Sequence, residues 1–472
     1  MTERLPRRAQ EAIRCTRMQM RKPGRWDLEE TILDVHCFDT AVSGVPATPT
    51  VGRTYAWAVF ALTFGLLLSD YMSRQVLNAV FPLLKSAWGL SDTRLGSLSG
   101  IVALIVGLLT FPLSVIADRL GRVRSIVVMA MVWSLATLGC ALATNFGELF
   151  VARAFVGLGE AAYGSVGVAL ILSIFPAHLR STLTAAFMAG GAFGSVLGMS
   201  LGGAVAVHLG WRWSFGTMAL LGILLTAAFW LVVTEKRIGT DARGLRQQRS
   251  NNQGIGTSLR VLINGLFSTV SVVCAYVGSG LQLFILGSLF VWMPSYLNRY
   301  YDMAPDKAGA AAAAFVMIGA VGMVLCGMVT DRVSRQEPSR KWVSAIAYCL
   351  ISFVLLGIGF HVKPGALQLV LIGVGMLVVA GTSGPAGAMV ANLTPTTIHA
   401  SAFATLTLAN NLLGLAPGPF LTGVVADKVG LHGALQLIPF MALLAAVAFS
   451  VGKASYANDL RRLNELRSAA KR

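Results

Sequence analysis

The chain has 472 residues and a composition that excludes an ordinary soluble protein. Hydrophobic residues make up 55% of it, charged residues only 12%, and the mean hydropathy is +0.68. Globular domains carry about 25% charged residues, so a soluble enzyme, a disordered protein and a collagen-like fibre are excluded. The net charge of +17 does not indicate a nucleic-acid partner, because the cytoplasmic loops of membrane proteins carry excess Lys and Arg.

Long apolar runs indicate membrane-spanning helices. A helix needs about 20 apolar residues to cross a bilayer, whereas a β-barrel would show shorter alternating segments. The first half of the chain predicts spans at 55–83, 92–117, 123–143, 147–174, 180–208 and 212–234. The second half predicts spans at 271–296, 306–330, 341–360, 365–391, 397–425 and 433–453. We therefore expect an all-α membrane protein with twelve transmembrane helices in two bundles, 55–234 and 271–453.

Three polar segments flank or separate these bundles. Residues 1–54 lack the apolar core of a signal peptide and predict a cytoplasmic tail. Residues 235–270 contain the longest polar interruption and predict a cytoplasmic linker, and residues 454–472 predict a cytoplasmic tail with a short basic helix at the inner membrane surface. The loops that this orientation places inside carry more Lys and Arg than the outer loops. We expect a multi-pass protein of the inner (plasma) membrane with both termini in the cytoplasm.

A short motif occurs twice at equivalent places. SVIADRLGR at 114–122 follows the second span, and GMVTDRVSR at 327–335 follows the eighth. Parallel halves of this kind are typical of transporters. The carboxylates end helices at the inner face, where they can meet an Arg or the positive end of a neighbouring helix; the alternative is a signal for membrane topology only. The predicted cytoplasmic gate comprises Asp118, Arg119, Arg122, Asp331, Arg332 and Arg335.

These two loops resemble the signature loop of the major facilitator superfamily, and the resemblance covers roughly residues 55–453. It implies two six-helix bundles related by pseudo-two-fold symmetry and a transporter that works by alternating access. The copies differ from the family pattern, because Ser114 and Ser334 stand where glycine is usual.

Four ionisable residues interrupt the apolar spans of the first half. Asp70 and Arg74 lie one turn apart on span one, and Arg153 and Glu160 lie two turns apart on span four, so each pair shares a helix face. Charged groups in the hydrocarbon cost at least ~2.5–3.5 kcal/mol each on insertion scales and mark functional sites. Counting ~1.5 Å per residue places the two carboxylates at one depth and the two guanidinium groups at another. The alternative is a static ion pair within each helix.

If spans one and four face a common cavity, Arg74 and Arg153 would hold an anion and Glu160, with Asp70, would carry a coupling proton. Burial disfavours a charged carboxyl and a neighbouring guanidinium favours it, so an arriving anion can alter the protonation of Glu160.

Two motifs on these spans resemble branches of the superfamily. RAFVGLGEAAY at 153–163 resembles its fourth-helix motif, and the part that ends at Tyr163 resembles the spinster branch. We predict that Tyr163 contacts the substrate beside Arg74 and Arg153. YMSR at 71–74 is similar to that branch's Tyr-Met-Asp-Arg, with Ser73 in the place of Asp. Anion:cation symporters also combine a span-one Arg with a continuation like QVLN at 75–78, so both branches stay open.

The second half has no charge at mid-membrane depth. Its deep neutral groups are candidates for hydrogen bonds to the rest of a substrate, or for hydrogen bonds between helices. They are Gln282, Thr382, Ser383, Asn410 and Asn411, of which Gln282, Asn410 and Asn411 are the predicted substrate contacts. The run GLAPGP at 414–419 predicts a break in span eleven. Gly190, Gly194, Gly198 and Gly202 on span five predict close helix packing.

The pattern favours proton-coupled uptake of a small organic anion, a carboxylate, by a secondary active transporter. The alternative is a spinster-like or multidrug-type exporter of a lysolipid or amphiphilic compound. Nucleophile elbows, metal-ligand spacings and phosphate loops are missing from the sequence, so we expect no enzyme activity, no cofactor and no metal. The expected partners are a small-molecule substrate, protons and the lipid bilayer, and the expected state is a monomer.

Overall fold

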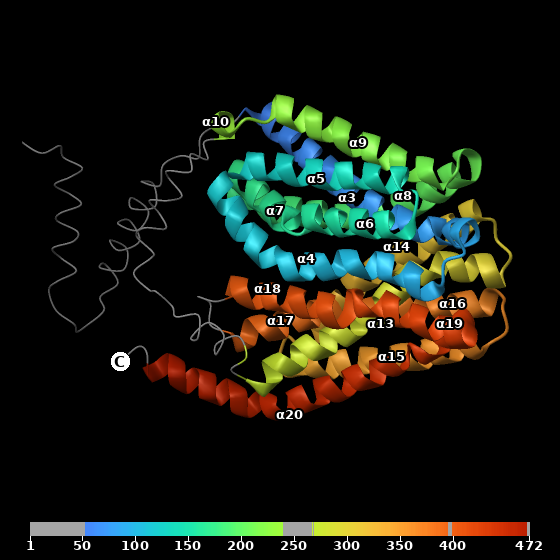
Figure 1. Cartoon of the computed structure of the whole chain (residues 1–472). Coiled ribbons are helices and arrows are strands. Elements are labelled where there is room, and N and C mark those ends of the chain that lie inside the picture. Colours follow the sequence, from blue (N-terminus) through green and yellow to red (C-terminus); the bar gives the residue numbers. More distant parts are fainter. Residues whose placement is uncertain (1–51, 239–266, 268, 395–398, 470–472) are drawn as a thin grey trace, which may run out of the picture. The chain divides into compact units, whose positions relative to one another are not determined.

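The computed structural model describes residues 52–238, 267, 269–394 and 399–469 of the chain (Figure 1). Most of the predicted tail 1–54 and of the predicted linker 235–270 lies outside the described residues, so both stay predictions. Residues Arg53–Arg472 belong to one compact unit, and its described secondary structure is helical.

Six spans make up the first half of this unit. They are α3 (Arg53–Trp88), α4 (Asp92–Leu120), α5 (Arg122–Leu142), α6 (Phe146–Glu160) continued by α7 (Tyr163–Ile174), α8 (Ala177–Leu209) and α9 (Trp211–Val232). The short helix α10 (Glu235–Ile238) follows them.

Six further spans make up the second half. They are α13 (Val270–Tyr300), α14 (Pro305–Val333), α15 (Arg340–His361), α16 (Ala366–Val379) continued by α17 (Ser383–Leu393), α18 (His399–Asn410) continued by α19 (Pro417–Leu437), and α20 (Phe440–Ala469). The described residues thus hold the twelve membrane-length spans that the apolar runs predict. This confirms the number of spans and most of their boundaries within a few residues.

Three spans are interrupted, and only one interruption was predicted. Span four breaks at residues 161–162, between α6 and α7, and span ten passes through a 3-10 turn at Ala380–Thr382. Span eleven contains a π-helical turn, η3 (Asn411–Leu415), just before Pro417, which confirms the predicted break. Spans four and ten hold equivalent places in the two halves. Such irregular backbone is tolerated at membrane depth where other helices bury it.

The last span begins close to its predicted start, 433, and extends beyond its predicted end, 453. Gly430 has φ +76 and changes the chain direction inside α19, the helix resumes at Leu431, and α20 follows a turn at 438–439. α20 then continues without a break into the predicted basic helix. The Asp459 carboxylate fastens this extension, since it accepts hydrogen bonds from the Ser271 backbone N–H (3.0 Å) and hydroxyl (2.6 Å) at the start of α13.

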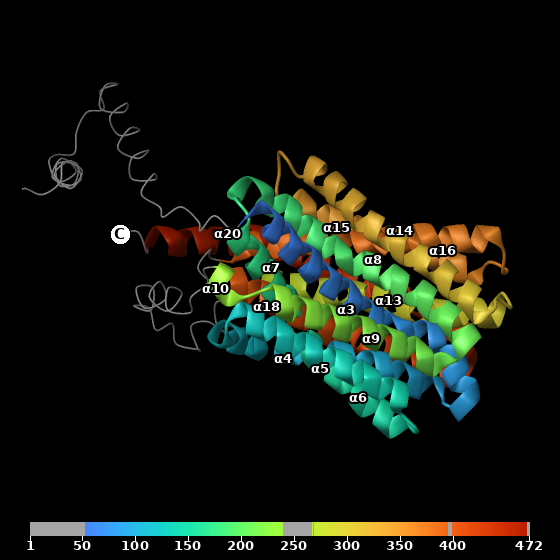
Figure 2. The ribbon, with the colours of Figure 1, turned by 90° about the horizontal axis from the view of Figure 1, so that it is seen from above.

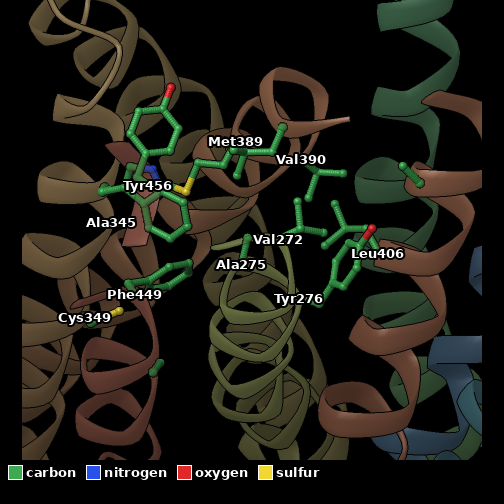
Figure 3. Packing of buried hydrophobic residues seen from close by; sticks show 14 of the residues in the cluster. Val272, Ala275, Tyr276, Ala345, Cys349, Met389, Val390, Leu406, Phe449 and Tyr456 are labelled. Carbon is green, nitrogen blue, oxygen red and sulfur yellow. The ribbon is translucent and has the colours of Figure 1, made fainter. Parts of the chain in front are cut away.

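The extended α20 also completes an apolar core in the second half. Figure 3 shows Val272, Ala275 and Tyr276 of α13 among the cluster that includes Phe449 and Tyr456 of α20. Side chains from α15, α17 and α18 join the same cluster. Lipid tails are as apolar as these side chains, so the bundle is stabilised by close van der Waals packing rather than by removal of apolar surface from water.

The glycines of α8 bring it close to α3, as the four-residue spacing predicts. A Cβ at Gly194 would lie 2.7 Å from the Leu68 carbonyl oxygen, and one at Gly198 would lie 2.7 Å from the Met72 Cα. Gly202 faces Val76 in the same way. This confirms the predicted packing groove, and it fixes the helix that carries Asp70 and Arg74.

The two halves lie side by side and meet through helix pairs that are equivalent in the two halves. Figure 1 shows the first half, blue to green, on one side of the bundle and the second half, yellow to red, on the other. Across the boundary α4 packs against α19 and α8 packs against α14, and Figure 2 shows α8 running beside α14. The pairs therefore form a repeated contact between the halves.

The halves approach most closely at the end where α3 ends and α4 begins, which we call the closed end. A Cβ at Gly100 of α4 would lie 2.6 Å from the Ala416 carbonyl oxygen. A Cβ at Gly203 of α8 would lie 2.8 Å from the Pro305 carbonyl oxygen. Small residues allow backbones to approach this closely, so the halves are shut against each other at this end.

The α3–α8 packing predicts that Gly198→Ala destabilises the bundle, because the added methyl meets the Met72 backbone and overpacking costs about 1–3 kcal/mol. We expect a lower melting temperature of the detergent-purified protein, measured by intrinsic fluorescence. Gly357→Ala on α15 is the matched control, since a Cβ there has no neighbouring atom within 4 Å. Equal melting temperatures for the two variants would contradict this packing.

Candidate functional site

The intramembrane charges of spans one and four meet between α3 and α6. The Arg74 Nη1 lies 3.7 Å from the Glu160 Oε2. The Glu160 side chain is 4% exposed, whereas the Arg74 side chain is 23% exposed. The ion pair therefore joins two helices instead of lying within either one, and its cation is the more accessible partner.

Asp70 adds a second carboxyl to this pair. It is buried, and its electrostatic neighbours are Glu160 and Arg74. Its Oδ1 and both Glu160 carboxylate oxygens are buried without a hydrogen-bond partner among the described residues. Arg74 and then Arg153 are the cationic neighbours of Glu160, and of these two guanidinium groups Arg74 forms the ion pair. Within the same described ranges, His, Cys, Asp and Glu side chains form no group of three or more that could hold a metal ion.

The break in span four comes directly after Glu160. Glu160 is the last residue of α6, and Ala162 has φ −115 and ψ −2 before α7 begins. The C-terminal end of a helix carries a partial negative charge, so a carboxylate there depends on Arg74 or on a proton. Two alanines are good helix formers, which explains why the sequence did not indicate the break.

Arg153 lies in a different environment from the one predicted for it. It is 1% exposed, and its guanidinium donates to backbone carbonyl oxygens. Nε donates to Leu98 at 3.3 Å, Nη1 to Ser73 at 3.2 Å and Nη2 to Arg74 at 3.3 Å. These bonds tie α6 to α3 and α4. The geometry therefore makes Arg153 a residue that positions Arg74, and leaves Arg74 as the better candidate for contact with an anion.

Tyr163 is also engaged inside the first half. Its hydroxyl donates to the Thr63 carbonyl oxygen at 2.6 Å, and its ring meets Trp133 edge to face with 4.9 Å between centroids. The predicted contact of Tyr163 with substrate would require this hydrogen bond to break.

The neutral candidates of the second half fall into two groups. Gln282 is 1% exposed and lies against Cys349 of α15, within its own half. Asn411 packs beside Gly107 of α4 in the first half. Its Nδ2 donates to the Thr407 carbonyl oxygen at 2.9 Å, and its Oδ1 is buried without a described partner, as is the Oδ1 of Asn410. Both polar atoms of the Gln282 amide are also buried without a described partner. Gln282 lies within its own half, however, whereas Asn411 reaches the first half from a π-helical turn, a feature that is frequent at functional sites.

The predicted gate residues lie at the end opposite the closed end. Arg119 is exposed, and so are Asp331, Arg332 and Arg335, whereas the Asp118 side chain lies outside the described residues.

Arg122 hydrogen-bonds the Ala169 carbonyl oxygen at 3.0 Å, within its own half. Gly121 has φ +94 and so requires glycine, whereas Ser334 at the equivalent place has φ −92. This explains how the second copy accepts a serine.

Sequence reasoning missed a second group of charges, at the closed end. Lys85, Asp92, Arg299 and Asp427 come together there from four helices, as described below. Each stands near the end of a predicted span, where a charged residue is ordinary, so the sequence held no signal that they meet.

Comparison with known proteins shows which family this chain matches. The model of the Major Facilitator Superfamily matches residues 63–416. The chain is 26% identical to a gallate transporter of Pseudomonas putida, over 87% of this chain and 93% of that protein. It is 25% identical to a hexuronate transporter of Bacillus subtilis (strain 168), over 80% of this chain and 90% of that protein.

A solved structure shares the fold. It is the crystal structure of a bacterial homolog to the human lysosomal transporter Spinster, in an inward-facing and unoccupied conformation, with a TM-score of 0.75. The sequences are 18% identical, and the match covers 86% of this chain and 99% of that one. Two six-helix bundles related by pseudo-two-fold symmetry are therefore the fold of this chain.

The surroundings of the two arginines predict that Arg153→Lys and Arg74→Lys act differently. Lysine cannot reproduce three diverging hydrogen bonds, so Arg153→Lys should lose about 1–3 kcal/mol of stability and lower the melting temperature. Arg74→Lys keeps the charge at a partly exposed position and should change the melting temperature little. A larger loss in Arg74→Lys would contradict the positioning role of Arg153.

Proposed function

The chain belongs to the major facilitator superfamily, and from this premise we propose that it is a secondary active transporter that takes up a small organic carboxylate with protons by alternating access. The observation that carries the proposal is the buried Arg74–Glu160 ion pair with the Asp70 carboxyl beside it. Such a group can bind an anion and exchange a proton at one place.

The proposed coupling follows from competition for Arg74. A substrate carboxylate and Glu160 both attract the same guanidinium, and the guanidinium is the partner with solvent exposure. When substrate takes the guanidinium, Glu160 is left at a helix end beside Asp70. Its remaining cationic neighbour is Arg153, whose guanidinium is bonded to backbone carbonyl oxygens, so the repulsion between carboxylates favours uptake of a proton. Substrate binding and protonation would then occur together, and both would be released to the cytoplasm.

The rest of the substrate would meet neutral groups. We propose that Asn410 and Asn411 accept hydrogen bonds from its hydroxyl groups, because their amide oxygens are buried without a described partner. Gallate and hexuronate, named for the two similar transporters, are both hydroxylated carboxylates, which supports this substrate class.

The membrane orientation is part of the same proposal. Both termini would face the cytoplasm, since the basic loops lie on that side, and the chain would act as a monomer in the plasma membrane. The predicted gate, from Asp118 to Arg122 and from Asp331 to Arg335, would then close the cytoplasmic end. The closed end would face outward in the present conformation.

A second candidate function is export of a lysolipid or another amphiphile. The neutral character of the second half supports it, because its deep polar groups, among them Gln282, Asn410 and Asn411, carry no charge. The GLGEAAY run of α6 and α7, which resembles the spinster branch, supports it too. The two candidates differ in whether Arg74 is needed for binding.

The coupling proposal predicts that Glu160→Gln loses proton-driven accumulation but keeps exchange. Glutamine resembles the protonated acid and leaves Arg74 available to an anion. In proteoliposomes with an inward proton gradient, we expect accumulation of labelled gallate or hexuronate to fall about tenfold or more, the effect of about 1.4 kcal/mol, while exchange without a gradient persists.

Glu148→Gln is the matched control for this measurement. Glu148 lies on the same helix but is exposed, and its carboxylate accepts hydrogen bonds from the Thr144 backbone N–H (2.7 Å) and hydroxyl (3.0 Å). Its variant should accumulate substrate as the wild type does. Full accumulation by Glu160→Gln would remove Glu160 from proton coupling.

Ligand stabilisation separates the two candidate functions. A ligand at 100 times its Kd stabilises the folded state by about 2.7 kcal/mol, so we expect gallate or hexuronate to raise the melting temperature of the wild type but not of Arg74→Gln. Stabilisation of both proteins by a lysophospholipid, with no effect of the carboxylates, would favour the exporter instead.

A further inference from the structure

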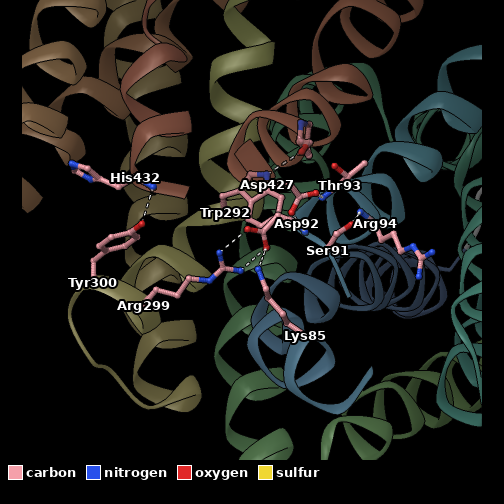
Figure 4. Close-up of polar contacts among 11 residues, drawn as sticks. Lys85, Ser91, Asp92, Thr93, Arg94, Trp292, Arg299, Tyr300, Asp427 and His432 are labelled. Atoms are coloured by element: carbon pink, nitrogen blue, oxygen red, sulfur yellow. Dashed lines mark hydrogen bonds and ion pairs between the residues drawn. The ribbon is translucent and has the colours of Figure 1, made fainter. Parts of the chain in front are cut away.

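A buried carboxylate at the closed end is held by cations from both halves of the protein. Asp92 is the first residue of α4 and is 3% exposed. Arg299 of α13 reaches it with two bonds, from Nη2 to Oδ1 (2.7 Å) and from Nη1 to Oδ2 (2.8 Å). Lys85 of α3 donates its Nζ to Oδ1 at 2.7 Å. Figure 4 shows the three side chains converging.

A second carboxylate, from the second half, binds the N-terminal end of α4. Asp427 of α19 accepts hydrogen bonds from the backbone N–H groups of Asp92 (2.7 Å) and Thr93 (2.9 Å). The first N–H groups of a helix have no partner within the helix and carry partial positive charge. A side chain from the second half therefore caps a helix of the first half.

Arg299 and Asp427 lie on α13 and α19, and hydrogen bonds join these two helices. The Trp292 Nε1 of α13 donates to the Pro419 carbonyl oxygen of α19 at 3.0 Å. The Tyr300 hydroxyl accepts from the His432 backbone N–H at 3.0 Å, a bond also drawn in Figure 4. Arg299 and Asp427 thus belong to one rigid part of the second half, and they hold or release α4 together.

We propose that Asp92, Arg299, Lys85 and Asp427 form an ionic clasp that keeps the closed end shut, and that each transport cycle must open it. Bidentate pairs of arginine with carboxylate are strong and fixed in direction, and every bond from Arg299 and Asp427 crosses the boundary between the halves. Opening this end separates the partners and admits water to them. The clasp is distinct from the predicted gate, because Asp92 lies at one end of α4 and the gate residues Asp118 and Arg119 lie at its other end.

The clasp predicts that neutral variants shift the protein toward a conformation open at this end, without any substrate. Spin labels at Ser86 and Lys363, exposed residues of the two halves at the closed end, report their separation in the full chain with its native cysteines replaced by alanine. We expect Asp92→Asn and Arg299→Gln each to raise the long-distance population about fivefold or more, within the usual range of coupling between sites.

Two further variants make the result decisive. Asp427→Asn should shift the distribution in the same direction by a smaller factor, and its exposed side chain makes misfolding no concern. The double variant Asp92→Asn with Arg299→Gln should shift no further than the larger single effect, because both changes remove the same bonds. Additive shifts would show independent effects and overturn the shared clasp.

Arg94→Gln is the matched control. Arg94 follows Asp92 on α4 but stacks on Phe146 within the first half, with 5.5 Å from its Cζ to the ring centroid, so its loss should leave the distance distribution unchanged. The proposal is overturned if Asp92→Asn, Arg299→Gln and Asp427→Asn all give the wild-type distribution while remaining folded by melting temperature. The measurement uses no substrate, so its result tests the clasp independently of the proposed carboxylate transport.

Discussion

A charge within a bilayer has to find its partner inside the protein, and this constraint shapes the first half of the molecule. Arg74 and Glu160 meet across α3 and α6, and Asp70 stands beside them. The Asp70 Oδ1 and both Glu160 carboxylate oxygens have no hydrogen-bond partner among the described residues, and this incomplete bonding is the chemically useful feature, because a satisfied pair would be inert. Next to this group, the Arg153 guanidinium donates hydrogen bonds to backbone carbonyl oxygens. The glycines of α8 pack closely against α3 and fix its position. The surrounding structure thus fixes the position of a small group that is itself left incomplete.

The boundary between the halves uses two different kinds of contact. Between α4 and α19, and between α8 and α14, backbones touch through glycines such as Gly100 and Gly203. Contacts of this kind are close but short in range, so they disappear as soon as the helices separate. The bonds around Asp92 are longer in reach and directional. Together they give a closed conformation that is held at its rim by charge and along its length by packing.

The sequence predicted the periodic and compositional features well. Apolar runs of membrane length fixed the twelve spans, GLAPGP foretold the disturbance before Pro417, and the spacing of glycines such as Gly198 foretold the α3–α8 contact. Features that depend on which helices become neighbours could not be predicted from the sequence. The Arg74–Glu160 pair was one of several combinations open to four charges, and the carbonyl partners of Arg153 come from two other helices, α3 and α4. Asp92 was least visible, because a charge at a span end needs no partner.

The three bonds of Arg153 have a mechanical consequence. They fasten Leu98 of α4 and the Ser73–Arg74 stretch of α3 to a single rigid side chain. Leu98 lies less than two turns from the helix start that the second half holds. A tilt of α4 at that end therefore displaces the Arg153 side chain and, through it, the carbonyl groups of Ser73 and Arg74. The Arg74 guanidinium, which we propose binds the anion, would move together with α4. Substrate binding and opening of the closed end would therefore be mechanically coupled.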